Sequence, residues 1–414
     1  MTNKPPMLTA QQALDHLLSH AQSVGDSEMV AMQAALGRVL AESVNSLVDV
    51  PPLDNTSMDG YAVRCADTAT PGQTLTIAQR IPAGSMGVQL EPGTAARIFT
   101  GAPVPPGADA VIMQEDCAIN EGSPDHVQVN VVPQVGQWIR RQGEDLSAGK
   151  LALSAGTFLR PQELGVAASA GLTHLNVKRR VKVAAFFTGD ELALPGQPLK
   201  PGGIYNSNRD TLLACLRSLG CDATDLGIVP DRLDATRDAL RKASKDHDLI
   251  LTSGGVSVGE EDHIKPAVTA EGRLDLWQIA IKPGKPLAFG AVRKSESPQD
   301  GEAWFIGLPG NPVSSFVTFL LFVRPFILKL QGRETKSIPP YMMRADFDWL
   351  KADRRNEFLR VKINQRGGLD LFPNQSSGVL TSASWGDGLV DCPPGQAIHA
   401  GDLVKYIPFD ALLT

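Results

Sequence analysis

The stretch from residue 180 to residue 331 alternates apolar strand patterns with amphipathic helix patterns, and this alternation constrains the fold most strongly. Residues 181–187 are almost continuously apolar, as expected of a parallel strand that is covered on both faces. The patterns that follow are helix 209–218, strand 223–229, helix 233–245, strands 248–252, 274–281, 286–289 and 304–307, and helix 312–330. This order predicts a doubly wound α/β domain, whose ligands bind beyond the carboxyl ends of the strands.

The regions on either side of this domain have a different character. Between about residues 48 and 143 prolines and glycines are frequent and apolar runs are short, for example 110–113 and 127–132, which indicates short strands and turns. Short strands return after Gly332 and predict a small β-barrel or sandwich. Helical periodicity near the start of the chain predicts two helices, at 9–21 and around 29–43.

Charge and cysteine usage limit the function classes. The 414 residues include 39 Lys and Arg against 45 Asp and Glu, a net charge of −6, which argues against broad nucleic-acid or anionic-membrane binding. The five cysteines are scattered and never spaced as C-x-x-C, so a reduced cytoplasmic chain is expected. The chain opens without a signal-peptide pattern. The apolar stretch 316–328 contains Arg324 and Pro325, which favours a buried helix over a membrane span.

Three loops that follow strands carry the residues most suited to chemistry, at 188–192, 252–262 and 308–312. The glycines of the second loop allow the backbone to approach a ligand and to direct N–H groups at an anion. In the third loop, Asn311 and Pro312 are suited to cap a helix whose N-terminus attracts phosphate. A single glycine turn or capped helix is usually structural. Three such loops on one sheet predict a phosphate or oxyanion site.

Charged residues near these loops extend the prediction. Lys282 and Lys285 flank a Pro-Gly pair after a strand and supply local positive charge to an acidic chain. Glu191 and Asp262 would face the same anion and repel it unless a cation intervened. Mg²⁺, which prefers oxygen ligands, fits this pair. The alternative is that Glu191 begins a helix, Asp262 belongs to a turn and the lysines are solvated. The chain has no P-loop motif, which excludes P-loop kinases and ATPases.

Seven motifs in order resemble the MoeA family, the molybdopterin molybdenumtransferases related to the E domain of gephyrin. They are DNTSMDGYA (54–62), TGAP (100–103), RQGED (141–145), TGDE (188–191), SGGVS (253–257), IKPGKP (281–286) and LPGNP (308–312). The resemblance covers nearly the whole chain and is looser over the last eighty or so residues.

The resemblance implies an α/β multidomain fold with four regions and a homodimer with composite active sites. The regions are a mixed α/β region (1–49 with 147–179), an elongated β-rich region (50–146), the α/β molybdopterin-binding domain (180–331) and a C-terminal β-barrel (332–414). The implied reaction transfers molybdenum from molybdate to adenylylated molybdopterin with Mg²⁺, and releases AMP. A molybdopterin adenylyltransferase and downstream proteins that use or modify the cofactor are the expected partners.

The site residues are assigned by the loop argument and by the positions that the family resemblance implies, which for Asp231, Arg360 and Ser377 lie outside these seven motifs. Catalytic roles are expected for Asp59, Thr100, Asp145, Glu191, Asp231, Asp262, Lys282 and Lys285, and metal binding for Glu191 and Asp262. Substrate binding is expected for Gly254, Gly255, Ser257, Gly259, Pro309, Gly310, Asn311, Pro312, Arg360 and Ser377.

Other functions share parts of this pattern. A molybdopterin adenylyltransferase uses a similar α/β domain but would need neither the region of Asp59 and Thr100 nor the C-terminal domain. A non-catalytic scaffold, like gephyrin in receptor clustering, is disfavoured by the uninterrupted set of charged motifs. A competence or nicotinamide-hydrolase protein with the same α/β domain is disfavoured by the flanking regions.

Overall fold

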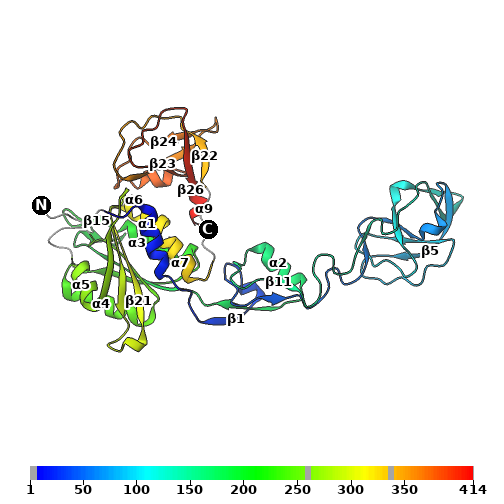
Figure 1. Cartoon of the computed structure of the whole chain (residues 1–414), viewed down its shortest axis with the longest axis horizontal. Helices are drawn as coiled ribbons and strands as arrows, with labels where there is room; N and C mark the ends of the chain where they lie inside the picture. The colour runs from blue at the N-terminus through cyan, green and yellow to red at the C-terminus, as the bar shows by residue number, and fades with distance from the viewer. Residues whose placement is uncertain (1–6, 257–262, 334–339, 414) are drawn as a thin grey trace. The chain divides into compact units, whose positions relative to one another are not determined.

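The computed structural model describes residues 7–256, 263–333 and 340–413 (Figure 1). Contacts divide the chain into two compact units, which are described separately below. We call Met1–Glu28 with Lys178–Thr414 the cavity unit, and Met29–Val177 the inserted unit. This division is coarser than the four predicted regions, whose boundaries remain a prediction.

The cavity unit is built on a six-stranded sheet with the order β16-β13-β17-β21-β20-β18. Its strands are β13 (Lys182–Thr188), β16 (Asp222–Val229), β17 (Leu249–Ser253), β18 (Gly272–Gln278), β20 (Pro286–Arg293) and β21 (Glu302–Leu308). The first four strands in spatial order are parallel, and β20 and β18 join them by antiparallel pairing. The carboxyl ends of β13, β17 and β21 therefore meet at one edge, as the sequence predicts.

Alternation along the strands builds a core on each face of this sheet. In β13, Val183 and Phe187 belong to one buried cluster, and Ala184 and Phe186 belong to the other. The first cluster includes helices α3 (Ser207–Ser218), α6 (Pro312–Thr318) and α7 (Arg324–Leu330), and the second includes α4 (Leu233–Asp246) and α5 (Ile264–Glu271). Figure 1 shows α4 and α5 on one side of the sheet and α3, α6 and α7 on the other. The doubly wound prediction is confirmed.

The long apolar helix belongs to this core. Helices α6 and α7 are joined by a π-helical turn, Phe319–Val323, so that 312–330 is one continuous helical segment. Its length and composition would suffice to cross a membrane, but 78% of its most apolar window is buried inside the protein. This is the burial expected of a core helix.

The start of the chain contains the first predicted helix but not the second. Helix α1 (Ala10–His20) forms with Thr9 as its N-cap, and Ala13 and Leu17 pack into the α/β core. The predicted helix at 29–43 is wrong. Strand β1 (Ser27–Ala31) and a 3₁₀ turn (Met32–Ala34) occupy its first part.

Strand-like pairing explains why the second helix does not form. Leu40 bridges to Val177 and Val39 bridges to Phe158, both in antiparallel fashion, so these apolar side chains are buried by extended neighbours. Gly37 has a φ of 72°, in the left-handed region, which ends any helical continuation. Tertiary contacts have here overridden a helical periodicity.

The inserted unit is rich in short strands, as its prolines and glycines predict. Its main sheet has the order β7-β4-β6-β5-β9-β8. Those strands are β4 (Gly60–Val63), β5 (Gln73–Ile81), β6 (Thr94–Ile98), β7 (Ala110–Met113), β8 (Cys117–Asn120) and β9 (Ser123–Val129). Two-stranded sheets pair β3 (Asn55–Thr56) with β10 (Ile139–Arg140) and β2 (Val44–Asn45) with β11 (Leu151–Leu153), and α2 (Pro161–Ser169) adds one helix.

The C-terminal part of the cavity unit is the predicted small barrel. Its strands are β22 (Tyr341–Arg344), β23 (Asn356–Ile363), β24 (Leu369–Leu371), β25 (Gly388–Cys392) and β26 (Leu403–Pro408). A bridge between Ala345 and Leu369 closes the sheet on itself. Strand β19 (Ile281–Lys282) pairs in parallel with β23, so the α/β part contributes an edge strand to the barrel sheet.

The chain leaves and re-enters the cavity unit at one anchored point. The backbone N–H of Arg179 donates to the carbonyl oxygen of Asp26 at 3.1 Å. The Arg179 guanidinium also binds the Asp26 carboxylate at 2.8 Å and the Asp248 carboxylate at 2.7 Å. The two ends of the inserted unit are therefore held together at the start of β17.

Candidate functional site

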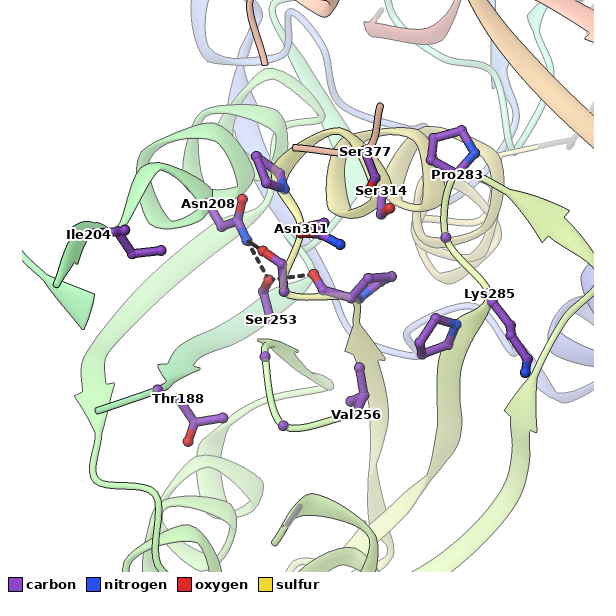
Figure 2. Close-up of a pocket in the computed structure, with 18 of the residues that line it drawn as sticks. Thr188, Ile204, Asn208, Ser253, Val256, Pro283, Lys285, Asn311, Ser314 and Ser377 are labelled. Atoms are coloured by element: carbon purple, nitrogen blue, oxygen red, sulfur yellow. Dashed lines mark hydrogen bonds between the residues drawn. The ribbon is translucent and has the colours of Figure 1, made fainter. Parts of the chain in front are cut away.

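A cavity of about 800 Å³ lies beyond the carboxyl ends of β13, β17 and β21. Its walls come from the three loops predicted at these strand ends, from the 282–286 turn and from residues 375–377 of the barrel (Figure 2). The predicted residues that line it are Glu191, Asp231, Gly254, Gly255, Lys282, Lys285, Pro309, Gly310, Asn311, Pro312 and Ser377. Residues from distant parts of the sequence thus share one cavity.

The glycine loop after β17 has no room for side chains. Gly254 has a φ of 99°, and a Cβ there would lie 2.3 Å from the carbonyl oxygen of Thr188. Gly255 has a φ of 61°, and a Cβ there would lie 2.8 Å from Ile264 and 2.9 Å from Thr188. Both positions therefore require glycine, and the peptide backbone itself forms this part of the wall.

The third loop differs from the prediction in one detail. Asn311 occupies the N-cap position of α6 and Pro312 the first helical position, but the Asn311 side chain makes no capping hydrogen bond. Its backbone carbonyl accepts from the Ser315 N–H at 2.9 Å. The Asn311 amide consequently remains with the residues that line the cavity, where Figure 2 shows it beside Ser314.

Carboxylates gather on the side of the cavity formed by the first loop. Burial raises the pKa of Asp231, while a hydrogen bond from the Thr188 hydroxyl, 3.3 Å away, partly offsets this effect. The charges of Asp190 and Glu191 add to the rise. Asp190 accepts a hydrogen bond from the Asp231 backbone N–H at 3.3 Å. Asp231 therefore retains a proton to higher pH than an ordinary aspartate.

Cations gather on the opposite side, near the barrel. The Lys282 ammonium lies 2.7 Å from the buried Glu357 carboxylate and 3.5 Å from Asp353. Within the described residues, no acidic side chain pairs with Lys285. Its ammonium is therefore the more available of the two for an anionic ligand.

The sequence interpretation missed Arg355, which also lines the cavity. Its guanidinium binds Asp353 through two hydrogen bonds, of 3.0 and 3.1 Å, and this pairing lowers the pKa of Asp353. Arg355 stands directly before β23, the strand that pairs with the Lys282 strand β19. That pairing, which joins residues some seventy-five apart, is the signal that would have identified it.

Arg360 is not among the residues that line the cavity, although it was predicted to contact substrate. Its side chain is 1% exposed and donates to the Ser382 hydroxyl and to the carbonyls of Phe358 and Ser376. Burial lowers the pKa of Arg360 to about 10. Its hydrogen bond to the Ser376 carbonyl attaches it to the loop that carries Ser377.

Three predicted residues lie in the inserted unit. The Asp59 carboxylate accepts two hydrogen bonds from Thr100, one from the backbone N–H and one from the hydroxyl, each 2.7 Å long. These bonds lower the pKa of Asp59. Asp145 is exposed, and its backbone N–H donates to the Val50 carbonyl at 3.0 Å. The Asp59–Thr100 pair joins two motifs that are forty-one residues apart.

Three further predicted residues, Ser257, Gly259 and Asp262, lie outside the described residues. The predicted metal pair is thus represented by Glu191 alone. Among residues 7–256, 263–333 and 340–413, no group of three or more His, Cys, Asp or Glu side chains is arranged to hold a metal ion.

Comparisons with known proteins match the chain along nearly its whole length. Residues 8–171 match the MoeA N-terminal region (domain I and II), 184–329 a probable molybdopterin binding domain, and 343–409 the MoeA C-terminal region (domain IV). The molybdopterin molybdenumtransferase of Haemophilus influenzae is 41% identical, with 98% of this chain and 100% of that protein covered. The enzyme of the same name from a Nostoc species is 34% identical, with 98% and 95% covered.

A solved structure shows the same architecture. The molybdopterin biosynthesis moeA protein from Pyrococcus horikoshii aligns with a TM-score of 0.82 at 28% identity, and the alignment covers 97% of this chain and 99% of that one.

Proposed function

Because the chain belongs to the MoeA family, we propose that it transfers molybdenum from molybdate to adenylylated molybdopterin and releases AMP. The observation that carries the proposal is the cavity, in which a backbone glycine wall, a helix start and a cationic side face one another. Both substrates are anions. The cavity brings together the hydrogen-bond donors and cations that bind anions, although the chain as a whole is acidic.

Each part of the cavity suits one part of this chemistry. Molybdate is a tetrahedral dianion whose oxygens only accept hydrogen bonds, so Lys285, Arg355 and Lys282 are suited to hold it. The phosphoanhydride of the adenylylated pterin suits the Gly254–Gly255 backbone and the start of α6. Cleavage of this bond releases AMP. The dithiolene sulfurs belong to the substrate, so the proposal needs no cysteine nucleophile.

We further propose that Mg²⁺ is held by Glu191 and Asp262 together with oxygens of the substrate. Oxygen ligands from one or two carboxylates, completed by phosphate oxygens and water, suit this ion. Glu191 lines the cavity and supplies carboxylate oxygens on the same side as Asp231. When bound, the ion would neutralise charge that develops on the phosphate.

We propose that the enzyme works in the cytoplasm as a homodimer, in which Asp59 and Thr100 of one subunit complete the cavity of the other. The support is that the matched motifs fall in two separate compact units, neither of which contains the whole set. A symmetric dimer uses one contact twice and so creates two composite sites. A molybdopterin adenylyltransferase would supply the substrate, and proteins that use or modify the cofactor would receive the product.

The decisive experiment supplies the purified protein with adenylylated molybdopterin, molybdate and Mg²⁺. We expect stoichiometric AMP release and molybdenum incorporation, and loss of both in Glu191→Gln and Asp262→Ala variants that remain folded. If the protein instead consumed ATP and molybdopterin to form the adenylylated pterin, it would be the adenylyltransferase. If it turned over neither substrate set, the scaffold interpretation would replace the proposal.

A further inference from the structure

Asn208 lies at the cavity, in the first turn of α3, and its amide joins two of the three functional loops. The Asn208 Nδ2 donates to the Ser253 hydroxyl at 2.8 Å and to the Gly310 carbonyl oxygen at 2.7 Å. The Ser253 hydroxyl in turn donates to the Pro309 carbonyl at 2.9 Å. Figure 2 shows these three bonds as a chain that crosses from α3 to the loop after β21.

The direction of these bonds fixes the orientation of the amide. A carbonyl oxygen accepts hydrogen bonds and never donates them, so the group that faces Gly310 must be the amide nitrogen. The Ser253 proton is used on Pro309, so Ser253 also accepts from the nitrogen of Asn208. The carbonyl oxygen of Asn208 must therefore point away from both partners.

This oxygen has no hydrogen-bond donor in the part of the chain that the structure describes, and Asn208 lines the cavity. The other groups that we assign to the cavity for anion binding are donors, namely Lys282, Lys285, Arg355, the glycine backbone and the start of α6. An acceptor among them would repel phosphate or molybdate. It suits a neutral part of the substrate that carries a hydroxyl or amino group.

We propose that Asn208 has two roles, one at each end of its amide. The nitrogen positions the Pro309–Gly310 loop against Ser253, and the oxygen accepts a hydrogen bond from a hydroxyl or amino group of the bound substrate. This proposal rests on the proposed function, because adenylylated molybdopterin offers such donors on its ribose, its adenine and its pterin. Asn208 thereby selects for the neutral portion of a substrate whose charged portion binds elsewhere in the cavity.

The test measures binding of AMP by isothermal titration calorimetry, with 2′-deoxy-AMP, 3′-deoxy-AMP and the 6-deamino analogue as separate arms and a simple pterin as a fourth ligand. For the wild type, we expect one of these deletions to weaken binding about tenfold, the effect of one lost hydrogen bond. In Asn208→Ala the same deletion should cost nothing, because its partner is gone. If no AMP analogue behaves in this way, pterin binding should weaken about tenfold in Asn208→Ala.

Two further variants separate the two roles. Ser253→Ala should weaken binding while the ratio between AMP and its analogue stays as in the wild type, because the Asn208 oxygen remains. Ser207→Ala is the matched control, since Ser207 is the exposed neighbour on the same helical turn, and it should bind all ligands normally. Asn208→Ser replaces Asn208→Ala if the latter does not fold.

The results separate a failure of the Asn208 proposal from a failure of the proposed function. If the wild type binds AMP, but Asn208→Ala retains full AMP and pterin affinity and the wild-type ratio for every analogue, the inference is overturned and the proposed function stands. If the wild type binds neither AMP nor the pterin, the proposed function fails and this inference fails with it.

Discussion

Asp59 in the inserted unit and Asp231 in the cavity unit are two carboxylates that their surroundings affect in opposite directions. Two hydrogen bonds from Thr100 lower the pKa of Asp59. Burial raises the pKa of Asp231, and a longer hydrogen bond from Thr188 together with the charge of His263 offsets only part of the rise. Each aspartate thus pairs with a threonine, but Asp59 is held ionised by its pair, whereas Asp231 takes up a proton more readily.

We infer from this difference that Asp59 and Asp231 have separate roles, which the sequence leaves open. A group that transfers protons works best when its pKa lies nearer to the working pH, which favours Asp231 over Asp59. Asp59, held as an anion by its hydrogen bonds, is better suited to binding a cation or a donor group. Each of the following experiments either sharpens this contrast or removes it.

The largest effect is expected when inactive variants of the two units are mixed. Asp59→Ala and Glu191→Ala should each abolish turnover, and their mixture should recover about one quarter of the wild-type activity. Half of the dimers formed by random exchange are mixed, and one of their two composite sites is intact. The measurement is AMP release after subunit exchange has been demonstrated by mass spectrometry. Exchange without recovered turnover would place both residues in the site of a single chain.

A loss of roughly 10²- to 10⁴-fold in kcat is expected for Asp231→Asn if Asp231 transfers a proton. The control is Asp234→Asn, three residues away, where an exposed carboxylate pairs with Arg232 at the start of α4 and faces no substrate in our proposal. Single-turnover rates of AMP release compare the two variants. Equal, near-normal rates would remove Asp231 from the chemistry and with it the contrast to Asp59.

Lys285→Ala and Lys282→Ala should differ in kind. Lys285→Ala should weaken molybdate binding about tenfold and change stability by less than about 0.5 kcal/mol, because its ammonium has no described acidic partner. Lys282→Ala should also destabilise the protein by about 1–3 kcal/mol, since the buried Glu357 loses its cation. Titration with molybdate and urea unfolding separate the two effects. Equal stability of the two variants would show that the Lys282–Glu357 pair contributes little.

The smallest effect concerns the two threonines. Removal of a hydroxyl that donates to a carboxylate raises its pKa, so Thr188→Val should raise the pKa of Asp231 further and Thr100→Val should raise that of Asp59. If both carboxylates must be ionised, the higher pKa sets the acid limb of kcat/KM. Thr188→Val should therefore move this limb to higher pH, and Thr100→Val should leave it in place. A shift with Thr100→Val alone would reverse the roles proposed for the two aspartates.

The sequence predicted the parts of this molecule that depend on local pattern. Apolar runs located β13 and β17, and the loops after them line the cavity as expected. The helix at 29–43 was mispredicted because the partners of Leu40 and Val39 lie more than a hundred residues away. Position-by-position resemblance suggested Asp59 and Thr100, whose direct hydrogen bonds only the fold reveals.

The arginines of the C-terminal region show where such reasoning stops. Arg354, Arg355 and Arg360 lie within seven residues, and all have the same chemistry. Arg355 lines the cavity, whereas Arg360 is buried beneath the 375–377 loop. Which one meets a ligand depends on how β23 pairs with β19 and β25, and no local pattern encodes that pairing.

The contact between Asp26 and Arg179 makes residues 29–177 an insertion between two neighbouring points of the cavity unit. A backbone hydrogen bond joins Asp26 and Arg179, which flank the two ends of the inserted unit, so a short turn can connect them. Excision of residues 29–177 would then leave the α/β sheet and the barrel with every one of their own strands. We therefore expect that the inserted unit of a homologue can replace residues 29–177 without a change in the register of any strand of the α/β sheet.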